Sequence, residues 1–188
     1  VPWGLIWNEL KLEGKTDDHA LAMVFVRESQ KAEGLAIVEA ACRGAKLEPV
    51  AWRNVPFVRE ELGSSQADLA PIVYQLVVKR TGLDDAAFDQ ALLIARRMAE
   101  KLARQASLSD FSLPSLSRNT VVYKALVVPS ALPKLYPDLL NPEFVTAVAL
   151  FHQRFSTNTM TSWHLAQPLR MLAHNGEINT LLGNVNRL

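Results

Sequence analysis

Short apolar runs alternate along the chain with stretches whose apolar residues recur at helical spacing. Residues 20–27, with the sequence Ala-Leu-Ala-Met-Val-Phe-Val-Arg, form a run of the length expected for a buried strand. Residues 50–55, 72–79 and 121–128 are further runs of this kind, and 72–79 is enriched in β-branched side chains. The pattern therefore predicts a strand at each of these places.

Two other stretches have the spacing of amphipathic helices. In the first, Leu35, Val38, Ala41 and Cys42 fall on one helical face, and Gly44 is suited to end the helix. The second is predicted to run from about residue 84 to residue 104. Its apolar face consists of Phe88, Leu92, Ala95, Ala99 and Leu102.

The charged residues of the longer helix fit its N-terminus and its outer face. Asp84 and Asp85 suit the partial positive charge at a helix N-terminus. We interpret the basic residues as a solvated face rather than as an anion site. These are Arg96, Arg97, Lys101 and Arg104.

The pattern is weaker between residues 129 and 151. Prolines punctuate 129–142, which predicts a loop with at most one helical turn. Residues 144–151 are apolar and fit a helix or a strand equally well. Helices and strands are interspersed throughout, without an internal repeat or a linker, so the sequence predicts mixed helix and sheet.

Composition narrows the class of protein. The chain has 188 residues, is 49% hydrophobic and 21% charged, which fits one soluble globular domain, or at most two. No apolar run approaches the ~20 residues of a membrane span. A net charge of +1 gives no reason to expect nucleic acid or a membrane as a partner. A single cysteine excludes an internal disulfide and fits a reducing compartment, so we expect a cytoplasmic location.

The two ends of the sequence suggest a segment of a longer polypeptide. Val1-Pro2-Trp3 resembles neither a signal peptide nor a transit peptide. Residues 184–188 follow a helix-like stretch without a glycine cap or a polar tail. We therefore expect both ends to lie inside a larger chain.

Several kinds of chemistry lack their usual sequence support. The glycine-rich phosphate-binding motifs and the Gly-x-Ser-x-Gly motif are absent. Cys42 lies on an apolar helical face, where we expect a buried and inert thiol. His152, His164 and His174 do not have the spacing of a zinc site, and no cysteine or close carboxylate completes a set. A metal site is therefore disfavoured.

Residues 154–159, Arg-Phe-Ser-Thr-Asn-Thr, combine a guanidinium with several hydroxyl and amide groups. Such a set offers a fork for a carboxylate and hydrogen-bond partners for a small polar ligand. A polar strand end with a surface arginine has the same composition. The residues alone leave these two interpretations balanced.

His174-Asn175-Gly176-Glu177 predicts a tight turn, because Asn-Gly adopts positive φ at little steric cost. The Asn175 side-chain N–H and the Gly176 backbone N–H could also point at one developing negative oxygen, as in an oxyanion hole. A turn without catalytic function has the same sequence, so this motif is weak evidence on its own.

Taken together, the motifs form a run that resembles the class II glutamine amidotransferase domain of the glutamate synthase large subunit. The run consists of Arg154-Phe155-Ser156-Thr157-Asn158-Thr159, Ser162-Trp163, Leu165-Ala166-Gln167-Pro168, Leu172-Ala173-His174-Asn175-Gly176-Glu177-Ile178-Asn179-Thr180 and Gly183-Asn184. Weaker resemblance extends upstream through 115–124 and 135–139 and reaches 23–26. Thr161, Leu169 and Arg187 depart from the family's usual Pro or aromatic residues, which suggests a divergent member.

The resemblance implies an α+β fold of the N-terminal-nucleophile hydrolase type. In that fold two antiparallel sheets lie between helical layers, as an αββα four-layer sandwich. Residues 1–188 would be an incomplete class II glutamine amidotransferase domain, lacking its N-terminal nucleophile segment and its C-terminal continuation. Loss of flanking strands would leave sheet edges unpaired, so we expect the chain to aggregate.

The resemblance also assigns roles to individual residues. Arg154 would hold the α-carboxylate of glutamine, and Thr157 would line the same pocket. Asn175 and Gly176 would form the oxyanion hole. Gln167 and His174 would support the substrate site.

By the same resemblance the parent enzyme hydrolyses glutamine to glutamate and ammonia and passes the ammonia to 2-oxoglutarate. The nucleophile, an N-terminal cysteine, is absent from this chain, so we expect the isolated chain to be inactive. The implied partners are glutamine, the remaining domains of the parent and a small reductase subunit. FMN and an iron–sulfur cluster belong to the parent, and no cofactor is expected in this segment. The alternatives are a non-catalytic glutamine-binding or assembly module and another class II amidotransferase.

Overall fold

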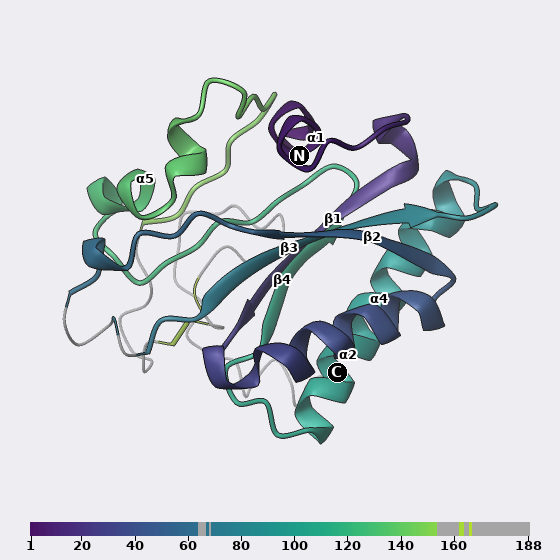
Figure 1. The fold of residues 1–188 in the computed structure, drawn as a ribbon, viewed down its shortest axis with the longest axis horizontal. Coiled ribbons are helices and arrows are strands. Elements are labelled where there is room, and N and C mark those ends of the chain that lie inside the picture. The colour runs from purple at the N-terminus through teal and green to yellow at the C-terminus, as the bar shows by residue number, and fades with distance from the viewer. Residues whose placement is uncertain (64–66, 68, 154–161, 164–165, 167–188) are drawn as a thin grey trace, which may run out of the picture.

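The computed structural model describes residues 1–63, 67, 69–153, 162–163 and 166. Within these residues the chain forms one antiparallel sheet of four strands in the order β2-β3-β1-β4 (Figure 1). The strands are β1 (His19–Val26), β2 (Leu47–Asn54), β3 (Ile72–Arg80) and β4 (Ser112–Ser117). The described chain is therefore α+β, as predicted.

Two helices connect the strands as β1-α2-β2-β3-α4-β4. They are α2 (Lys31–Gly44) and α4 (Asp85–Gln105), and both lie on the same face of the sheet (Figure 1). This element order and strand order are those of the ferredoxin-like, split βαβ arrangement. The second sheet of the predicted four-layer sandwich is not among the described residues and stays a prediction.

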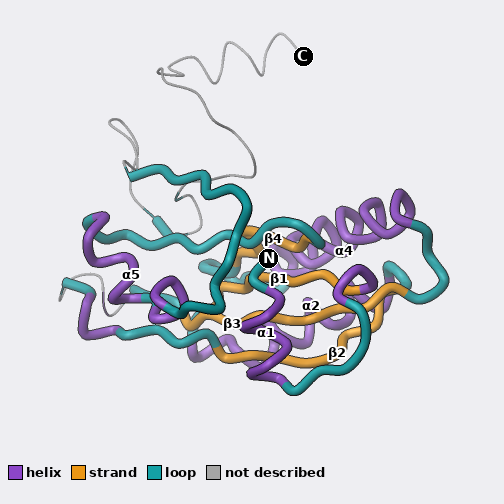
Figure 2. Tube along the Cα trace, turned by 90° about the horizontal axis from the view of Figure 1, so that it is seen from above, coloured by secondary structure: helices purple, strands orange, loops and turns teal. Residues whose placement is uncertain are grey.

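The other face of the sheet carries α1 (Trp3–Leu10), α5 (Leu132–Leu135) and the irregular segment between β4 and α5 (Figures 1 and 2). Ile6 of α1 packs on Leu21 and Val77 of the sheet. Short 3₁₀ helices complete the described structure. They are η1 (Thr16–Asp18), η2 (Glu28–Gln30), η3 (Arg59–Glu61), η4 (Pro129–Ala131) and η5 (Pro137–Leu140).

Strand β1 is buried along its whole length because both of its faces are covered. Successive side chains of a strand point to opposite faces. Ala22 and Val24 accordingly belong to the core cluster beneath α2 and α4, whereas Met23 and Phe25 belong to a second cluster on the opposite face. This two-sided burial explains why β1 reads as an unbroken apolar run in the sequence.

Most predicted elements are confirmed with shifted ends, and the helix predicted at 84–104 corresponds to α4. Asp84 lies at the N-terminus of α4 as predicted, and as its N-cap it accepts a 2.8 Å hydrogen bond from the Ala87 backbone N–H. The strands predicted at 20–27, 50–55 and 72–79 are β1, β2 and β3.

Three expectations for the second half of the chain were wrong. Residues 121–128 form no strand, because side chains bind their backbone instead: Ser115 Oγ accepts from the Val122 N–H, and the Tyr136 hydroxyl donates to the Lys124 carbonyl. Residues 144–151 form neither helix nor strand and are largely exposed. Residues 129–142 contain η4, α5 and η5, more helical structure than the single turn predicted.

Candidate functional site

Of the residues between the two predicted site motifs, the structure describes Ser162, Trp163 and Ala166. The Ala166 backbone N–H donates a 3.4 Å hydrogen bond to the Trp163 carbonyl. Trp163 is 5% exposed and packs in the second core cluster with Phe25 and Tyr136. Trp163 is thus packed against the face of the sheet that lies opposite α2 and α4.

Trp163 belongs to a group of side chains that make edge-to-face aromatic contacts. We call Phe57, Tyr123, Tyr136, Phe144 and Trp163 the aromatic cluster. The ring centroids of Phe57 and Tyr136 are 5.1 Å apart, those of Tyr123 and Tyr136 5.2 Å, and those of Phe57 and Trp163 6.2 Å. Such pairs stabilise by about 0.5–1.5 kcal/mol each beyond the area that they bury. The cluster therefore holds Trp163 among the side chains on this face of the sheet.

Lys124 brings a charged group into this apolar region. The residue is 3% exposed, and its Nζ donates a 3.2 Å hydrogen bond to the Ala166 carbonyl. Nζ also lies 5.8 Å from the centroid of the Phe25 ring. Burial, and to a lesser extent the positive charge of Arg96, lower the pKa of Lys124 to about 8.

A second polar group on the same face is a buried ionic network around Arg53 of β2. Its Nη1 donates to Asp138 Oδ2 at 2.6 Å and to Gln75 Oε1 at 3.0 Å, and its Nε donates to Glu9 Oε2 at 2.8 Å. The Tyr123 hydroxyl donates to Asp138 Oδ2 at 2.7 Å. Burial alone would lower the pKa of Arg53, but the hydrogen bonds and charges of Asp138 and Glu9 raise it above its ordinary value.

The Arg53 network has a structural role rather than a ligand-binding one. Each guanidinium nitrogen of Arg53 donates to a protein acceptor, and both Asp138 oxygens accept hydrogen bonds from Arg53. Burial and the Asp138 carboxylate raise the pKa of Tyr123, so its hydroxyl stays protonated as a donor. The network joins α1, β2, β3 and η5 and offers no free guanidinium N–H to a ligand.

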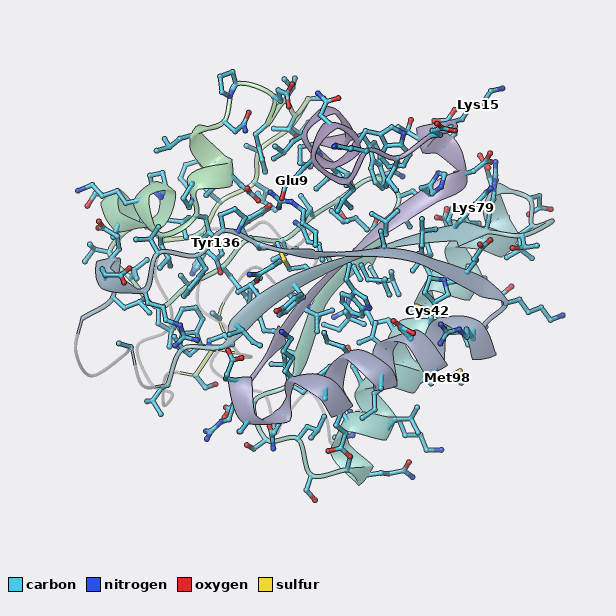
Figure 3. All side chains as sticks on the ribbon, viewed as in Figure 1. Glu9, Lys15, Cys42, Lys79, Met98 and Tyr136 are labelled. Carbon is cyan, nitrogen blue, oxygen red and sulfur yellow. The ribbon has the colours of Figure 1, made fainter. Side chains whose placement is uncertain are left out.

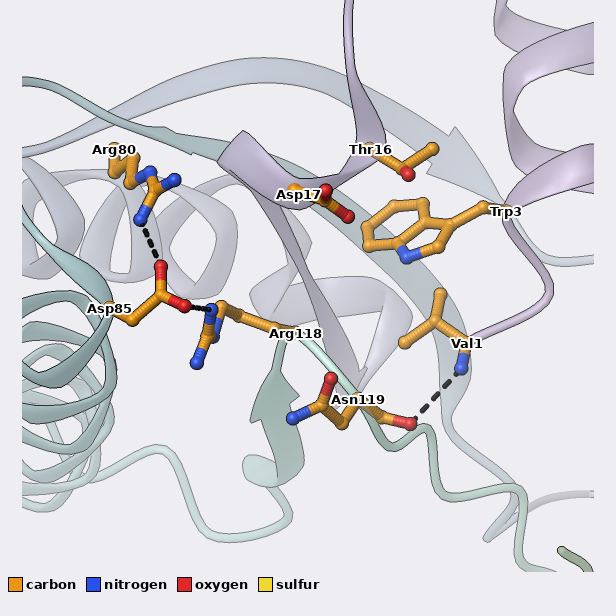
Figure 4. A pocket seen from close by; sticks show the side chains of 8 residues that line it. All are labelled: Val1, Trp3, Thr16, Asp17, Arg80, Asp85, Arg118 and Asn119. Carbon is orange, nitrogen blue, oxygen red and sulfur yellow. Dashed lines mark hydrogen bonds and ion pairs between the residues drawn. The ribbon is translucent and has the colours of Figure 1, made fainter. Parts of the chain in front are cut away.

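A cavity of about 460 Å³ lies at the opposite end of the sheet (Figure 4). Its lining includes Arg80 and Arg118, which share the carboxylate of Asp85. Hydrogen bonds from these two arginines hold the pKa of Asp85 below its ordinary value. Their other nitrogens bind Asp18 and Asp89, so the cavity is bordered by closed ion pairs.

The structure confirms that Cys42 is buried within the core beneath α2 and α4 (Figure 3). Burial, and then the charge of Glu39, raise the pKa of its thiol to about 12, with Arg43 partly offsetting the shift. The thiolate that a nucleophile requires is therefore strongly disfavoured.

Of the other residues considered in the sequence analysis, some are described by the structure and some are not. Arg97, Lys101 and Arg104 of α4 are exposed, as expected for a solvated face. Arg96 is not, because its side chain is only 21% exposed, and it pairs with Glu100. His152 is exposed, whereas His164 and His174 lie outside the described residues. The described part of the chain contains no group of three metal-ligating side chains.

The predicted substrate and oxyanion residues lie outside the described residues, and their placement stays a prediction. They are Arg154, Thr157, Gln167, His174, Asn175 and Gly176. Sequence reasoning assigned no role to Lys124 or to the Arg53 network. In the sequence, Lys124 is distinguished only as the one charged residue within the apolar run 121–128.

Comparison with known proteins decides the family. The family described as "Glutamine amidotransferases class-II" matches residues 1–188. The chain belongs to the class II glutamine amidotransferase family. No helix in the described part of this amidotransferase chain is both long and apolar enough to cross a membrane.

Its relatives include glutamate synthases. The amidotransferase chain is 40% identical over 190 residues to "Ferredoxin-dependent glutamate synthase" of Cyanidium caldarium, covering 98% of the chain and 12% of that protein. It is 36% identical over 193 residues to the protein of the same description in Pyropia yezoensis, covering 99% of the chain and 12% of the relative. It is 43% identical over 136 residues to "Glutamate synthase [NADPH] large chain" of Azospirillum brasilense, covering 72% of the chain and 9% of the relative. The amidotransferase chain thus spans about 12% of the length of the relatives that it matches in full.

Proposed function

We propose that this chain forms part of the glutaminase domain of a glutamate synthase. In that role the parent enzyme hydrolyses glutamine to glutamate and ammonia and passes the ammonia to 2-oxoglutarate at a separate site. The observation that carries the proposal is the similarity to glutamate synthases across 98–99% of the chain. The motif runs at 154–159 and 174–180 support the same function.

Arg154 and Thr157 are the proposed substrate-binding residues of the first motif. The planar guanidinium of Arg154 would bind the α-carboxylate of glutamine through paired hydrogen bonds, a geometry that a lysine ammonium does not reproduce. Thr157 would line the same pocket through its hydroxyl group. Gln167 and His174 would support this pocket from the second half of the motif run.

Asn175 and Gly176 are the proposed oxyanion hole. When a thiolate attacks the side-chain amide carbon of glutamine, the carbonyl oxygen becomes negatively charged in the tetrahedral intermediate. The Asn175 side-chain N–H and the Gly176 backbone N–H would donate to that oxygen, and one such donor lowers a barrier by about 3 kcal/mol. Collapse of the intermediate expels ammonia and leaves a thioester, which water hydrolyses to glutamate.

The thiolate in this scheme comes from outside the 188 residues. Cys42 is unsuited to the role, because it is buried in the core and its thiol pKa is raised to about 12. We therefore propose that the chain provides the part of the site that holds the substrate and stabilises the oxyanion, and that it is inactive on its own.

The proposed parent fold is the N-terminal-nucleophile hydrolase sandwich, in which a second sheet packs on the first. Its support within the described residues is an exposed apolar strip formed by Val145, Val148, Leu150 and Phe151, whose exposed fractions are 71%, 79%, 47% and 84%. An apolar strip of this kind suits burial against a further layer.

FMN and an iron–sulfur cluster are proposed for other parts of the parent. The residues of this chain do not fit a cluster, because four cysteines are the usual ligands and the chain has one, which is buried. Relatives described as ferredoxin-dependent and as NADPH glutamate synthases are both similar to this chain, so either reductant, with or without a reductase subunit, fits the proposal.

Ammonia release from glutamine tests the proposal. The 188-residue chain is expected to release none above the blank, whereas the full-length polypeptide that contains it is expected to be active. In that polypeptide, Arg154→Lys should raise the KM for glutamine about tenfold or more, and Asn175→Ala should lower kcat by about 10²–10³. Gln105→Ala, at the end of α4, is the control and should change neither constant.

Two results would contradict the proposal. One is glutaminase activity in the isolated chain, because the nucleophile is placed outside it. The other is an active full-length enzyme in which Arg154→Lys and Asn175→Ala leave KM and kcat unchanged, because the two motifs would then not form the site.

A further inference from the structure

The outer face of α4 has an apolar centre. Leu93 and Ile94 lie near the middle of this helix and are 47% and 45% exposed, although both are large apolar side chains. Other residues, among them Phe88 and Leu92, form the side of α4 that packs into the core. Packing of the helix on the sheet therefore does not account for the apolar centre, by which we mean Leu93 and Ile94.

The N-terminal end of the same helix is acidic. The side chains of Asp85 and Asp89 are 69% and 55% exposed, so both reach solvent although each forms ion pairs with arginines of the sheet. The ion pairs at this end, together with the N-cap, comprise four carboxylates and two guanidinium groups, which leaves a net charge of −2. These groups belong to Asp18, Asp84, Asp85, Asp89, Arg80 and Arg118.

The C-terminal half of α4 is basic. Four basic side chains and one carboxylate leave it with a net charge of +3, and they belong to Arg96, Arg97, Lys101, Arg104 and Glu100. Glu100 pairs with both Arg96 and Arg97, yet the Arg97 side chain remains 70% exposed. Acidic and basic ends also suit the helix macrodipole, but that effect is confined to the first and last turns and does not explain the apolar centre.

A helix face with this pattern is complementary to itself when two copies lie antiparallel. A two-fold axis through the apolar centre of α4 brings the apolar centres of both copies together. The same axis brings Asp89 of one copy beside Arg97 of the second copy, and Asp85 beside Lys101, because these positions are equally far from residue 93. Each contact occurs twice, so the acidic end of each helix meets the basic half of the other.

We propose that the outer face of α4 is a homodimer interface, in which the apolar centres pack on each other and Asp89–Arg97 pairs between the copies set the antiparallel direction. Charge complementarity identifies the occupant as a second copy of this chain. A nucleic acid or an anionic membrane would match the basic half of the helix but would be repelled by its acidic end. The inference is independent of the proposed hydrolysis of glutamine.

The test measures the dissociation constant of the dimer by sedimentation equilibrium, in the full-length polypeptide that contains this chain. Arg97→Asp and Asp89→Lys each place like charges at both symmetry-related contacts, so each should raise that constant about tenfold or more. Arg97→Asp/Asp89→Lys exchanges the two charges and should return the constant to within about threefold of wild type. Lys134→Asp, an exposed charge reversal on α5, is the control and should leave it unchanged.

Leu93→Ser/Ile94→Ser tests the apolar centre without changing a charge, and it should also raise the dissociation constant about tenfold or more. Circular dichroism of each variant checks that the helices remain folded. Restoration by the double charge exchange is the decisive readout, because a general effect on folding would make the double variant worse than either single variant.

Three results would overturn the proposal. The first is a full-length polypeptide that stays monomeric up to about 100 µM. The second is an oligomer whose dissociation constant is the same in wild type, Arg97→Asp and Leu93→Ser/Ile94→Ser, because association would then use another surface. The third is a double charge exchange that dissociates as readily as the single variants. A closed pair has a fixed mass, which distinguishes it from the open-ended aggregation expected of the isolated chain.

Discussion

Arg53 carries its positive charge at a position that is 2% exposed. Its partner Asp138 is 3% exposed, and the two form a bidentate pair with bonds of 2.6 and 2.8 Å. Burial of an ion pair costs free energy that the attraction between the charges only roughly offsets. The pair therefore contributes less to stability than its geometry suggests, but the loss of either partner is costly.

Arg53→Met should lower the free energy of unfolding by about 3–5 kcal/mol, because it leaves the Asp138 carboxylate buried without its cation. Urea unfolding followed by circular dichroism measures this change. The double variant Arg53→Met/Asp138→Leu should recover part of the loss, since no buried charge remains. Arg97→Met on the outer face of α4 should stay within about 0.5 kcal/mol of wild type. Equal losses for the two arginine variants would contradict this account.

The environment of a single residue could be predicted where it depends on residues nearby in the sequence. The inertness of Cys42 was predictable because Val38 and Ala41 share its helical face. The Arg53–Asp138 pair was not predictable, because its members are 85 residues apart and no local pattern joins them. The site motifs were recognised as one continuous run, and their geometry lies outside the described residues.

At the scale of elements, two glycines of α2 show how a helix contacts its surroundings. A Cβ at Gly34 would stand 2.8 Å from Cγ2 of Val26, a fully buried side chain of β1. A Cβ at Gly44 would stand 2.9 Å from Cε of Met98 on α4. Val26 is β-branched and stiff, whereas the methionine methyl ends a flexible chain. Substitution by alanine should therefore affect stability differently at Gly34 and Gly44, although the two distances are nearly equal.

Gly34→Ala should lower the free energy of unfolding by roughly 1 kcal/mol, because overpacking costs more than the gain in helix propensity. Gly44→Ala should leave stability within about 0.5 kcal/mol of wild type, or raise it, because Met98 can move aside. Thermal or urea unfolding of both variants measures the difference. A Gly34→Ala variant more stable than Gly44→Ala would show that the contact with Val26 relaxes freely.

Elements were predictable where periodicity and burial agree. β1, β3 and α4 have the expected patterns, and their burial follows these patterns. β4 was missed because Ser-Leu-Pro-Ser-Leu-Ser has low strand propensity. It pairs nevertheless, as an edge strand whose Pro114 lies where the register against β1 shifts, a position at which proline is tolerated. Whether a segment of this kind forms a strand depends on its pairing with a distant strand, which no local sequence pattern indicates.

At the scale of the whole molecule, the apolar strip at residues 145–151 bears on the expected aggregation of the isolated chain. The sequence suggested unpaired sheet edges as the cause, and in the described sheet the edges are β2 and β4. The strip provides a second cause, since large exposed apolar patches favour association.

Val148→Ser/Phe151→Ser should reduce both the binding of an apolar fluorescent dye and the light scattering of the chain. Because both side chains are largely exposed, the free energy of unfolding should change by no more than about 0.5 kcal/mol per substitution. Leu93→Ser/Ile94→Ser on α4 removes two other exposed apolar side chains and is the matched control. Equal decreases in scattering from both pairs would show that the strip has no special part in association.

The strand order also has a consequence for how the chain is made. β1 lies between β3 and β4, so both of its hydrogen-bonding partners are synthesised well after it. At roughly 5–20 residues per second, about 5–20 s pass between the emergence of β1 and that of β4. During this time the most apolar strand of the sheet has an unpaired edge on the ribosome. Nascent chains that stop before Ser117 should therefore be substrates for chaperones that bind extended apolar segments.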